Sequence, residues 1–303
     1  MEHHEATRVL VWGTGAYFHL YFNHLLHMRE LGQVELVAIT GRDVPEVASI
    51  DGIPVLAREE AVALAFDLVV VMSTKYYPQI RDEVTQTWGV CGEKVVSCEL
   101  LCVPRIDLRR WLELRDSHVS VISNHHWGGL VCDQLQLRRR SPFCDLFVRE
   151  DDFFRLLSDP RRYVENTPLE FVERRVDTTG RAYPMMRLDD VALHFNNSTT
   201  PDEARAAWEQ QKASVNWDNV MVALCTTKPA HAEHLEGLVG YDKRVCFVPF
   251  ECDLAHALRI PQAPGETWFF NTVNGSAAKG TLNYCYDPVE LLLGNAHASR
   301  IVF

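Results

Sequence analysis

Short apolar segments rich in β-branched residues recur along the chain with helix-length segments between them, and this alternation constrains the fold most. Four of the segments lie in the first hundred residues, at 8–12, 35–40, 68–72 and 94–97. Continuous apolar strands separated by helices are typical of parallel sheets that are covered on both faces. The sequence therefore predicts an α/β fold with mainly parallel sheets.

The segment between the first two predicted strands has the spacing of a helix. Its apolar and aromatic side chains recur every three or four residues, and Gly32 follows as a stop signal. We expect this stripe to pack on the sheet, and its members are Tyr17, Leu20, Tyr21, His24, Leu25 and Met28. A strand, a glycine-containing turn and a helix predict a Rossmann-like N-terminal subdomain.

The same pattern begins again after a charged, helix-compatible segment at 104–116. Predicted strands lie at 119–123, 169–172, 191–195, 220–225 and 245–250, and predicted helices at 151–157, 201–213 and 229–238. At 303 residues the chain exceeds what one hydrophobic core usually organises. We therefore expect two Rossmann-like α/β subdomains, one over residues 1–105 and one over residues 106–303.

Charge, cysteine usage and hydropathy disfavour several classes of partner. A formal net charge of -11 disfavours a nucleic-acid groove, because phosphate binding needs clustered Lys and Arg. The nine cysteines, Cys285 among them, include no C-x-x-C pair, which favours reduced thiols over disulfides or zinc. The longest apolar run, 61–72, is too short to span a bilayer, and residues 1–5 show no secretion signal. We expect a cytoplasmic protein without stable membrane insertion, and keep a homodimer among the assemblies considered.

The turn after the first strand begins like a dinucleotide-binding motif. Gly13 permits a tight turn and Gly15 allows backbone to approach a phosphate, but Phe18 replaces the third glycine of G-x-G-x-x-G. The second strand ends in Thr40 without the usual acid for the ribose of NAD. The cofactor-binding candidates are Gly13, Thr14, Gly15, Tyr17, Arg42 and Asp43.

Three interpretations of this turn stay open. It can hold a nucleotide or nucleotide-sugar, it can belong to a domain that binds no cofactor, or, with less support, it can bind NAD. Arg42 favours a nucleotide or nucleotide-sugar, because it offers a cation to a phosphate group. Asp43 favours NAD, because it offers an acid to the ribose, although at a late position.

A second group of candidates follows the predicted strand 119–123, in "SNHHWGG". Histidine can act as a general base near neutral pH, an asparagine amide can orient a substrate, and two glycines can form an anion-binding turn. A structural turn with capping histidines is the alternative. The predicted base is His126, and the predicted substrate-binding residues are Asn124, His125, Trp127, Gly128 and Gly129.

Two further segments carry polar candidates. In "RLDDVALHFNNS", His194 ends a predicted strand that Asp190 precedes, and both are catalytic candidates, with Asn196 as a substrate-binding residue. Adjacent acids on a strand point to opposite faces, so we expect no metal there. Lys212 on the predicted helix 201–213 and Asn216 just after it are substrate-binding candidates, with a surface cation and a turn as the respective alternatives.

Taken in order, four segments resemble the bacterial domain-of-unknown-function family nineteen-nineteen, which is associated with exopolysaccharide and capsular polysaccharide biosynthesis. They are "ISNHHWGG", "SPFCDLFV", "DDVALHF" and "AWEQQKASVNWDNV", and the resemblance covers roughly residues 117 to 300. His125 stands where the family pattern has an asparagine. The resemblance implies a two-subdomain α/β protein and a role in surface-glycan assembly.

These observations lead to one expected function and two alternatives. We expect a transferase that uses a nucleotide-sugar or another activated donor and a glycan acceptor, with His126 or His194 as general base. The alternatives are an NAD-linked oxidoreductase or epimerase of sugar metabolism and a binding protein without catalysis. The sequence does not identify the cofactor beyond a suspected nucleotide-sugar donor.

Overall fold

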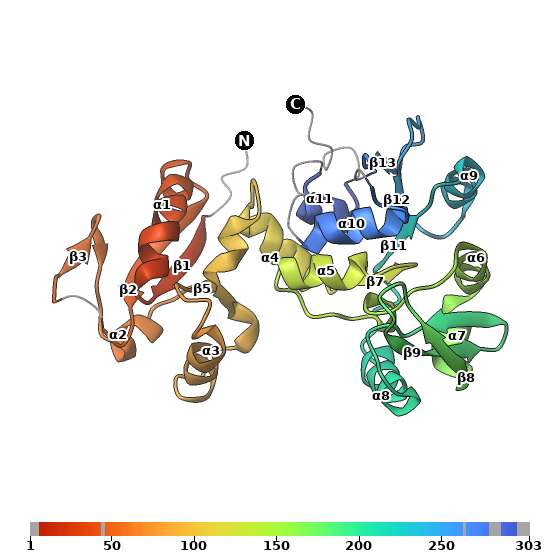
Figure 1. Cartoon of the computed structure of the whole chain (residues 1–303). Coiled ribbons are helices and arrows are strands. Elements are labelled where there is room, and N and C mark those ends of the chain that lie inside the picture. Colours follow the sequence, from red (N-terminus) through yellow and green to blue (C-terminus); the bar gives the residue numbers. More distant parts are fainter. Residues whose placement is uncertain (1–5, 44–45, 263–264, 279–285, 296–303) are drawn as a thin grey trace. The chain divides into compact units, whose positions relative to one another are not determined.

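The computed structural model describes residues 6–43, 46–262, 265–278 and 286–295. The chain divides into two compact units, residues 1–113 and residues 114–303 (Figure 1). Both units contain parallel β-sheets and helices, so the predicted α/β class is confirmed. Residues 1–5 and Cys285, on which part of the sequence analysis depends, lie outside the described residues.

Unit 1 is built on a four-stranded parallel sheet in the order β2-β1-β5-β6. Its strands are almost entirely buried, which agrees with their continuous apolar sequence. The strands are β1 Thr7–Trp12, β2 Val34–Thr40, β5 Leu68–Val71 and β6 Val95–Ser97, with a small hairpin of β3 Ser49–Ile50 and β4 Ile53–Pro54. The helices are α1 Ala16–Glu30, α2 Arg58–Val62, α3 Tyr77–Gln86, η1 Gly92–Lys94, η2 Cys98–Cys102 and α4 Leu108–Ser117, which crosses into unit 2.

The face of helix α1 that packs on the sheet matches the expected stripe only in part. Leu25 and Met28 of that stripe are buried, whereas Leu20 is 64% exposed. The other buried side chains of the helix are Phe18 and Phe22. Phe18 is buried and stacks on Phe22 at a ring-centroid distance of 4.2 Å. The helix therefore turns this pair inward, so an aromatic contact occupies the place of the missing third glycine.

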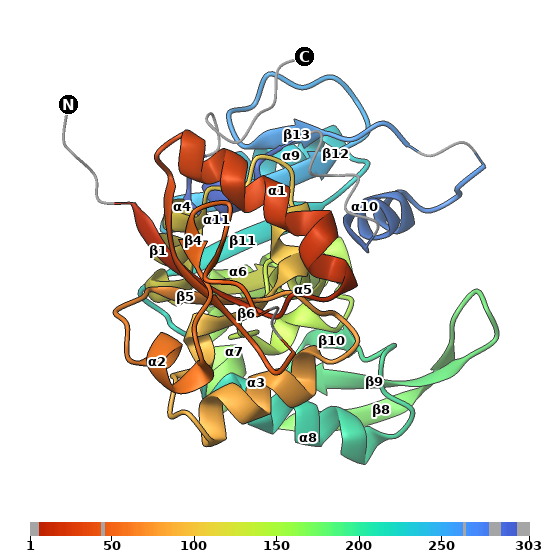
Figure 2. The ribbon, with the colours of Figure 1, turned by 90° about the vertical axis from the view of Figure 1, so that its left-hand side faces the viewer.

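Unit 2 contains a parallel sheet and a separate antiparallel sheet. The parallel sheet has the order β13-β12-β11-β7, and the antiparallel one has the order β10-β9-β8. The sequence analysis did not predict β9, whose hairpin with β8 extends from the unit (Figure 2). The strands are β7 Ser120–Ser123, β8 Leu169–Val176, β9 Ala182–Leu188, β10 Val191–His194, β11 Val220–Cys225, β12 Lys243–Val248 and β13 Ala257–Arg259.

The helices of unit 2 include the three that were predicted from the sequence, at slightly different bounds. Two of these begin at a proline, which suits the first helical position because its missing N–H would be unpaired there anyway. The helices are α5 Trp127–Gln134, η3 Pro142–Cys144, α6 Glu150–Ser158, α7 Pro160–Asn166, α8 Pro201–Lys212, α9 Pro229–Gly237, α10 Phe269–Ala278 and α11 Pro288–Leu293.

Gly128 and Gly129 lie within helix α5, so the expectation that they form an anion-binding turn is wrong. Glycine is required at both positions because a side chain would not fit between α5 and its neighbours. A Cβ on Gly128 would come within 2.9 Å of Ser123 Oγ, and one on Gly129 within 2.5 Å of the carbonyl oxygen of Cys144. The two glycines therefore let α5 approach β7 and η3 more closely than any side chain would allow.

We expect Gly129→Ala to lower the free energy of unfolding by about 1–3 kcal/mol, because the added methyl group overpacks α5 against backbone. Gly275→Ala in α10 is the matched control, since a Cβ there has no neighbour within 4 Å. That change should stabilise by about 0.5–1 kcal/mol, as for glycine in an open helix. Urea denaturation measures both, and equal effects would contradict the packing argument.

Candidate functional site

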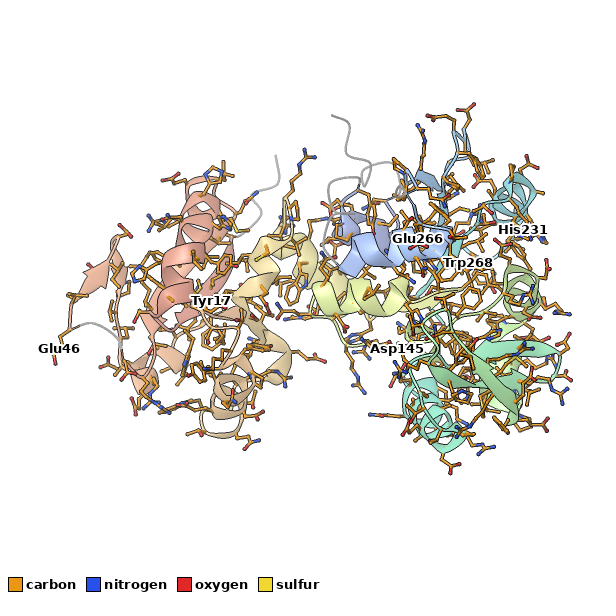
Figure 3. The ribbon with its side chains drawn as sticks, viewed as in Figure 1. Tyr17, Glu46, Asp145, His231, Glu266 and Trp268 are labelled. Carbon is orange, nitrogen blue, oxygen red and sulfur yellow. The ribbon has the colours of Figure 1, made fainter. Side chains whose placement is uncertain are left out.

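Unit 1 has a pocket of about 760 Å³ at the carboxyl ends of β1, β2 and β5. Strand β1 lies between β2 and β5, so the strand order reverses at β1: β2 is added on one side of it, and β5 and β6 on the other. Ligands of open parallel sheets bind where the strand order reverses. All six cofactor-binding candidates line this pocket. They are Gly13, Thr14, Gly15, Tyr17, Arg42 and Asp43, and Figure 3 labels Tyr17 on α1.

In the turn into α1, the backbone N–H of Gly13 donates to the carbonyl of Thr40 at 2.6 Å, whereas those of Thr14 and Gly15 have no partner among the described residues. Gly13 has φ 103°, a conformation that favours glycine, and Gly15 is an N-cap without a side-chain hydrogen bond. The first turn of α1 has no acidic residue to offset the helix dipole. Two exposed cations, Arg42 and Lys75, line the same pocket, which gives it the charges that a phosphate group needs.

Asn124 is buried and joins two strands of unit 2 beyond the end of β7. Its Oδ1 accepts a hydrogen bond from the Cys225 backbone N–H at 2.8 Å, and its Nδ2 donates to the Cys225 carbonyl at 3.1 Å. Asn124 Oδ1 also lies 3.1 Å from Nδ1 of His125. The side-chain amide thus makes the two hydrogen bonds to β11 that a neighbouring strand would otherwise make. Asn124 also lines a pocket of unit 2, described below.

His125 and Trp127 lie in the core rather than on an open surface. Both are 0% exposed, and each contacts the ring of Phe247. Trp127 Nε1 donates to Tyr286 Oη at 2.8 Å, whereas His125 Nε2 has no partner among the described residues. Burial lowers the pKa of His125 to about 3, so this imidazole is neutral near pH 7.

His126 and Asn196 come together at the start of α5. Burial lowers the pKa of His126, whereas Asp145 and the side chain of Asn196 act in the opposite direction. Asp145 also forms an ion pair with Arg139. His126 and Asn196 are thus neighbours across 70 residues of sequence, and neither lines the pocket of unit 2 that contains His194.

This pocket, the unit 2 pocket, has a volume of about 620 Å³ and lies at the carboxyl ends of β7 and β11. Asn124 and His194 are the predicted site residues on its wall. Five aromatic residues and three charged ones complete much of the wall. They are Phe147, Tyr183, Trp268, Phe269 and Phe270, with Arg149, Glu150 and Lys228.

His194 ends β10 and is held from two directions. Its backbone pairs with Phe147 in an isolated bridge, and its Nδ1 lies 3.1 Å from Tyr183 Oη. Its Nε2 is buried without a hydrogen-bond partner in the described part of the chain. Burial lowers the pKa of His194, and the nearby Arg175 and Arg149 lower it further.

Three candidates lie away from the unit 2 pocket. Asp190 sits in the β9–β10 turn, at the opposite end of β10 from His194, where it accepts a hydrogen bond from Tyr163 Oη at 2.6 Å. Lys212 pairs with Glu209 at the end of α8. The backbone N–H of Asn216 donates to Ser120 Oγ at the start of β7. The start of β7 is at the opposite end of the parallel sheet from the pocket, which lies at the carboxyl ends of the strands. The structure therefore does not bring these three to His194.

Sequence reasoning missed several residues of the two pockets. Lys228 follows β11 directly and could have been found from the rule that sites lie at the carboxyl ends of parallel strands. Trp268 begins a run of three aromatic residues that enters α10, and Figure 3 labels it beside Glu266. Arg149 and Tyr183 had no sequence signal, because only the tertiary fold brings them to His194.

Two kinds of site find no support in the described residues. No group of three or more His, Cys, Asp or Glu side chains in them is placed to hold a metal ion. The helices in that part of the chain are also too short or too polar to cross a membrane.

We expect stability to fall with acid because of His125. Its folded pKa is about 3 and its ordinary value is 6.5, so the unfolded state binds more protons between these limits. Stability therefore rises with pH in that window, and about 2 kcal/mol should be lost by pH 5 relative to neutral pH.

Urea denaturation of the wild type and of His125→Gln between pH 5 and pH 7 measures this effect. The variant should keep only the weaker pH dependence of the other buried histidines. Identical slopes in the two proteins would show that His125 is not the group responsible.

Comparison with known proteins agrees with the division into two units. Residues 5–96 match a family described as C2185-like, N-terminal. An uncharacterized protein of Haemophilus influenzae is 28% identical over 112 residues, which are 37% of this chain and 52% of that protein. The chain thus spans about half the length of this curated relative. Residues 98–281, more than half of the chain, match the Domain of unknown function (DUF1919), and the chain belongs to that family.

Proposed function

We propose that the chain is a transferase of surface-polysaccharide biosynthesis, which moves an activated group onto a hydroxyl of a glycan acceptor in the unit 2 pocket. The observation that carries this proposal is the imidazole of His194, which lines an aromatic pocket with its Nε2 unpaired. A pocket of apolar walls with a few polar groups, one of them with a displaced pKa, is the usual form of an active site. The resemblance in sequence supplies the polysaccharide context.

The chemistry follows from the protonation states of two side chains. Burial raises the pKa of Tyr183 and lowers the pKa of His194, so both are neutral near pH 7. When Nδ1 of His194 carries the hydrogen and donates it to Tyr183 Oη, Nε2 holds a lone pair. An acceptor hydroxyl gives its proton to Nε2, its oxygen bonds to the electrophilic carbon of the donor, and the leaving group departs with the bonding electrons.

The aromatic side chains of the pocket suit the acceptor. Trp268 is 52% exposed, and its ring centroid lies 5.8 Å from that of Phe270, which in turn contacts Phe147. Such a surface offers apolar faces to a sugar ring, while His194 and Asn124 offer polar atoms beside it.

The unit 1 pocket is the proposed site for the nucleotide part of the donor. The backbone N–H groups of Thr14 and Gly15 and the side chains of two cations, Arg42 and Lys75, supply phosphate contacts. Strand β2 ends in Thr40 instead of an acid, and the acid Asp43 follows only after Arg42, which favours a nucleotide-sugar over NAD.

We expect His194→Asn to lower turnover by about 10²–10⁴-fold, the usual contribution of a general base. The assay incubates the chain with nucleotide-sugars and bacterial polysaccharide fragments, and measures release of nucleoside diphosphate together with the mass of the acceptor. His24→Asn, at an exposed position of α1, is the control and should keep full turnover. Wild-type turnover in His194→Asn would show that another group is the base.

We expect uridine diphosphate to raise the melting temperature of the chain, and Arg42→Gln to weaken its binding by about tenfold, as for loss of one charged hydrogen bond. Arg205→Gln is the matched control, because Arg205 is an exposed arginine of α8 that pairs with Asp202. A melting temperature that uridine diphosphate leaves unchanged, or equal affinity in Arg42→Gln and Arg205→Gln, would exclude this pocket as the nucleotide site.

A further inference from the structure

Two helices that begin at the unit 2 pocket have a positively charged residue at the N-cap, a position where the helix dipole disfavours positive charge. Arg149 is the N-cap of α6 and Lys228 is the N-cap of α9, and neither side chain makes a capping hydrogen bond. N-caps are normally Ser, Thr, Asp or Asn, and a positive charge near a helix N-terminus is disfavoured by the helix dipole. Both cations line the pocket. The first turn of α6 has three acidic residues that already offset part of this cost, whereas the first turn of α9 has none, so an anion bound in the pocket would favour α9 most.

The charges on the pocket wall leave one arginine free. Glu150 lies 3.0 Å from Lys228 Nζ and 2.9 Å from Nδ1 of His231, which Figure 3 labels. Arg149 is exposed and has no ion pair among the described residues. The three charged side chains of the wall therefore leave a net positive charge in a chain whose formal charge is -11.

Thr226 adds a buried donor to the same wall. It is 2% exposed, and its Oγ1 accepts a hydrogen bond from the Lys228 backbone N–H at 3.1 Å. The hydroxyl hydrogen has no acceptor in the described part of the chain. A buried donor without an acceptor costs stability, so an oxygen of a ligand is the partner that this position lacks.

We propose that the unit 2 pocket binds an anionic group of its substrate, a carboxylate or a phosphate, and that the acceptor is therefore an acidic sugar. Arg149 supplies the opposite charge, and the hydroxyl of Thr226 supplies a hydrogen bond. The sugar part of this inference rests on the proposed function, whereas the anion part rests on the pocket alone.

Calorimetric titration of the full chain with four compounds at one ionic strength tests the inference. The compounds are glucose, glucuronate, glucose 6-phosphate and inorganic phosphate. We expect at least one of the two acidic sugars to bind about tenfold or more tightly than glucose, and the tighter of them identifies carboxylate or phosphate as the group. Arg149→Gln should reduce this preference to about twofold or less, and Arg149→Lys should restore part of it.

Arg205→Gln is the control and should keep the wild-type preference, and melting curves check that each variant is folded. Equal affinity of the wild type for glucose and both acidic sugars would overturn the inference without touching the proposed transferase. Tight binding of inorganic phosphate without binding of any sugar, weakened in Arg149→Gln but not in Arg42→Gln, would support the anion site and count against a sugar acceptor. Phosphate binding that only Arg42→Gln weakens would overturn the inference. An unchanged preference in Arg149→Gln, or no binding of any of the four compounds, would also overturn the inference.

Discussion

The side chain of Asn124 is the contact on which unit 2 depends. Its amide bonds to both backbone groups of Cys225, so β7 and β11 stay joined one residue beyond the end of β7. Its own carbonyl accepts from the N–H of Val148, which fixes the chain just before Arg149. One buried residue thus sets where α5 leaves the sheet and where α6 begins, and the unit 2 pocket lies between these points.

Close packing behind this contact separates two groups of histidines. Gly128 and Gly129 bring α5 against β7 and η3, which leaves Trp127 and His125 in the core. His126 then meets Asn196, whereas His194 lies on the wall of the pocket. The polar residues 124–127, which are consecutive in the sequence, therefore point to different surroundings where the chain enters α5. Only Asn124 among them lines the unit 2 pocket.

Much of the fold could be predicted because burial on both faces leaves a continuous apolar signal in parallel strands. The strand β9 was missed because its exposed and buried residues alternate and two methionines and a proline interrupt the β-branched pattern. The predicted face of α1 was correct at its C-terminal half and wrong at its N-terminal half. Several faces of an aromatic-rich helix satisfy the same spacing, and only contact with the sheet selects Phe18 and Phe22.

The sequence alone determined the α/β class, the glycine turn at the end of β1 and the candidacy of His194, because each depends on residues that are neighbours in the chain. The tertiary structure alone decided which candidates share a wall. It brought Arg149, Tyr183 and Trp268 to His194 and kept Asp190, Lys212 and Asn216 away. The physical reason is that a pocket at the end of a parallel sheet collects residues from several connections, and the spacing within one connection carries no information about the others.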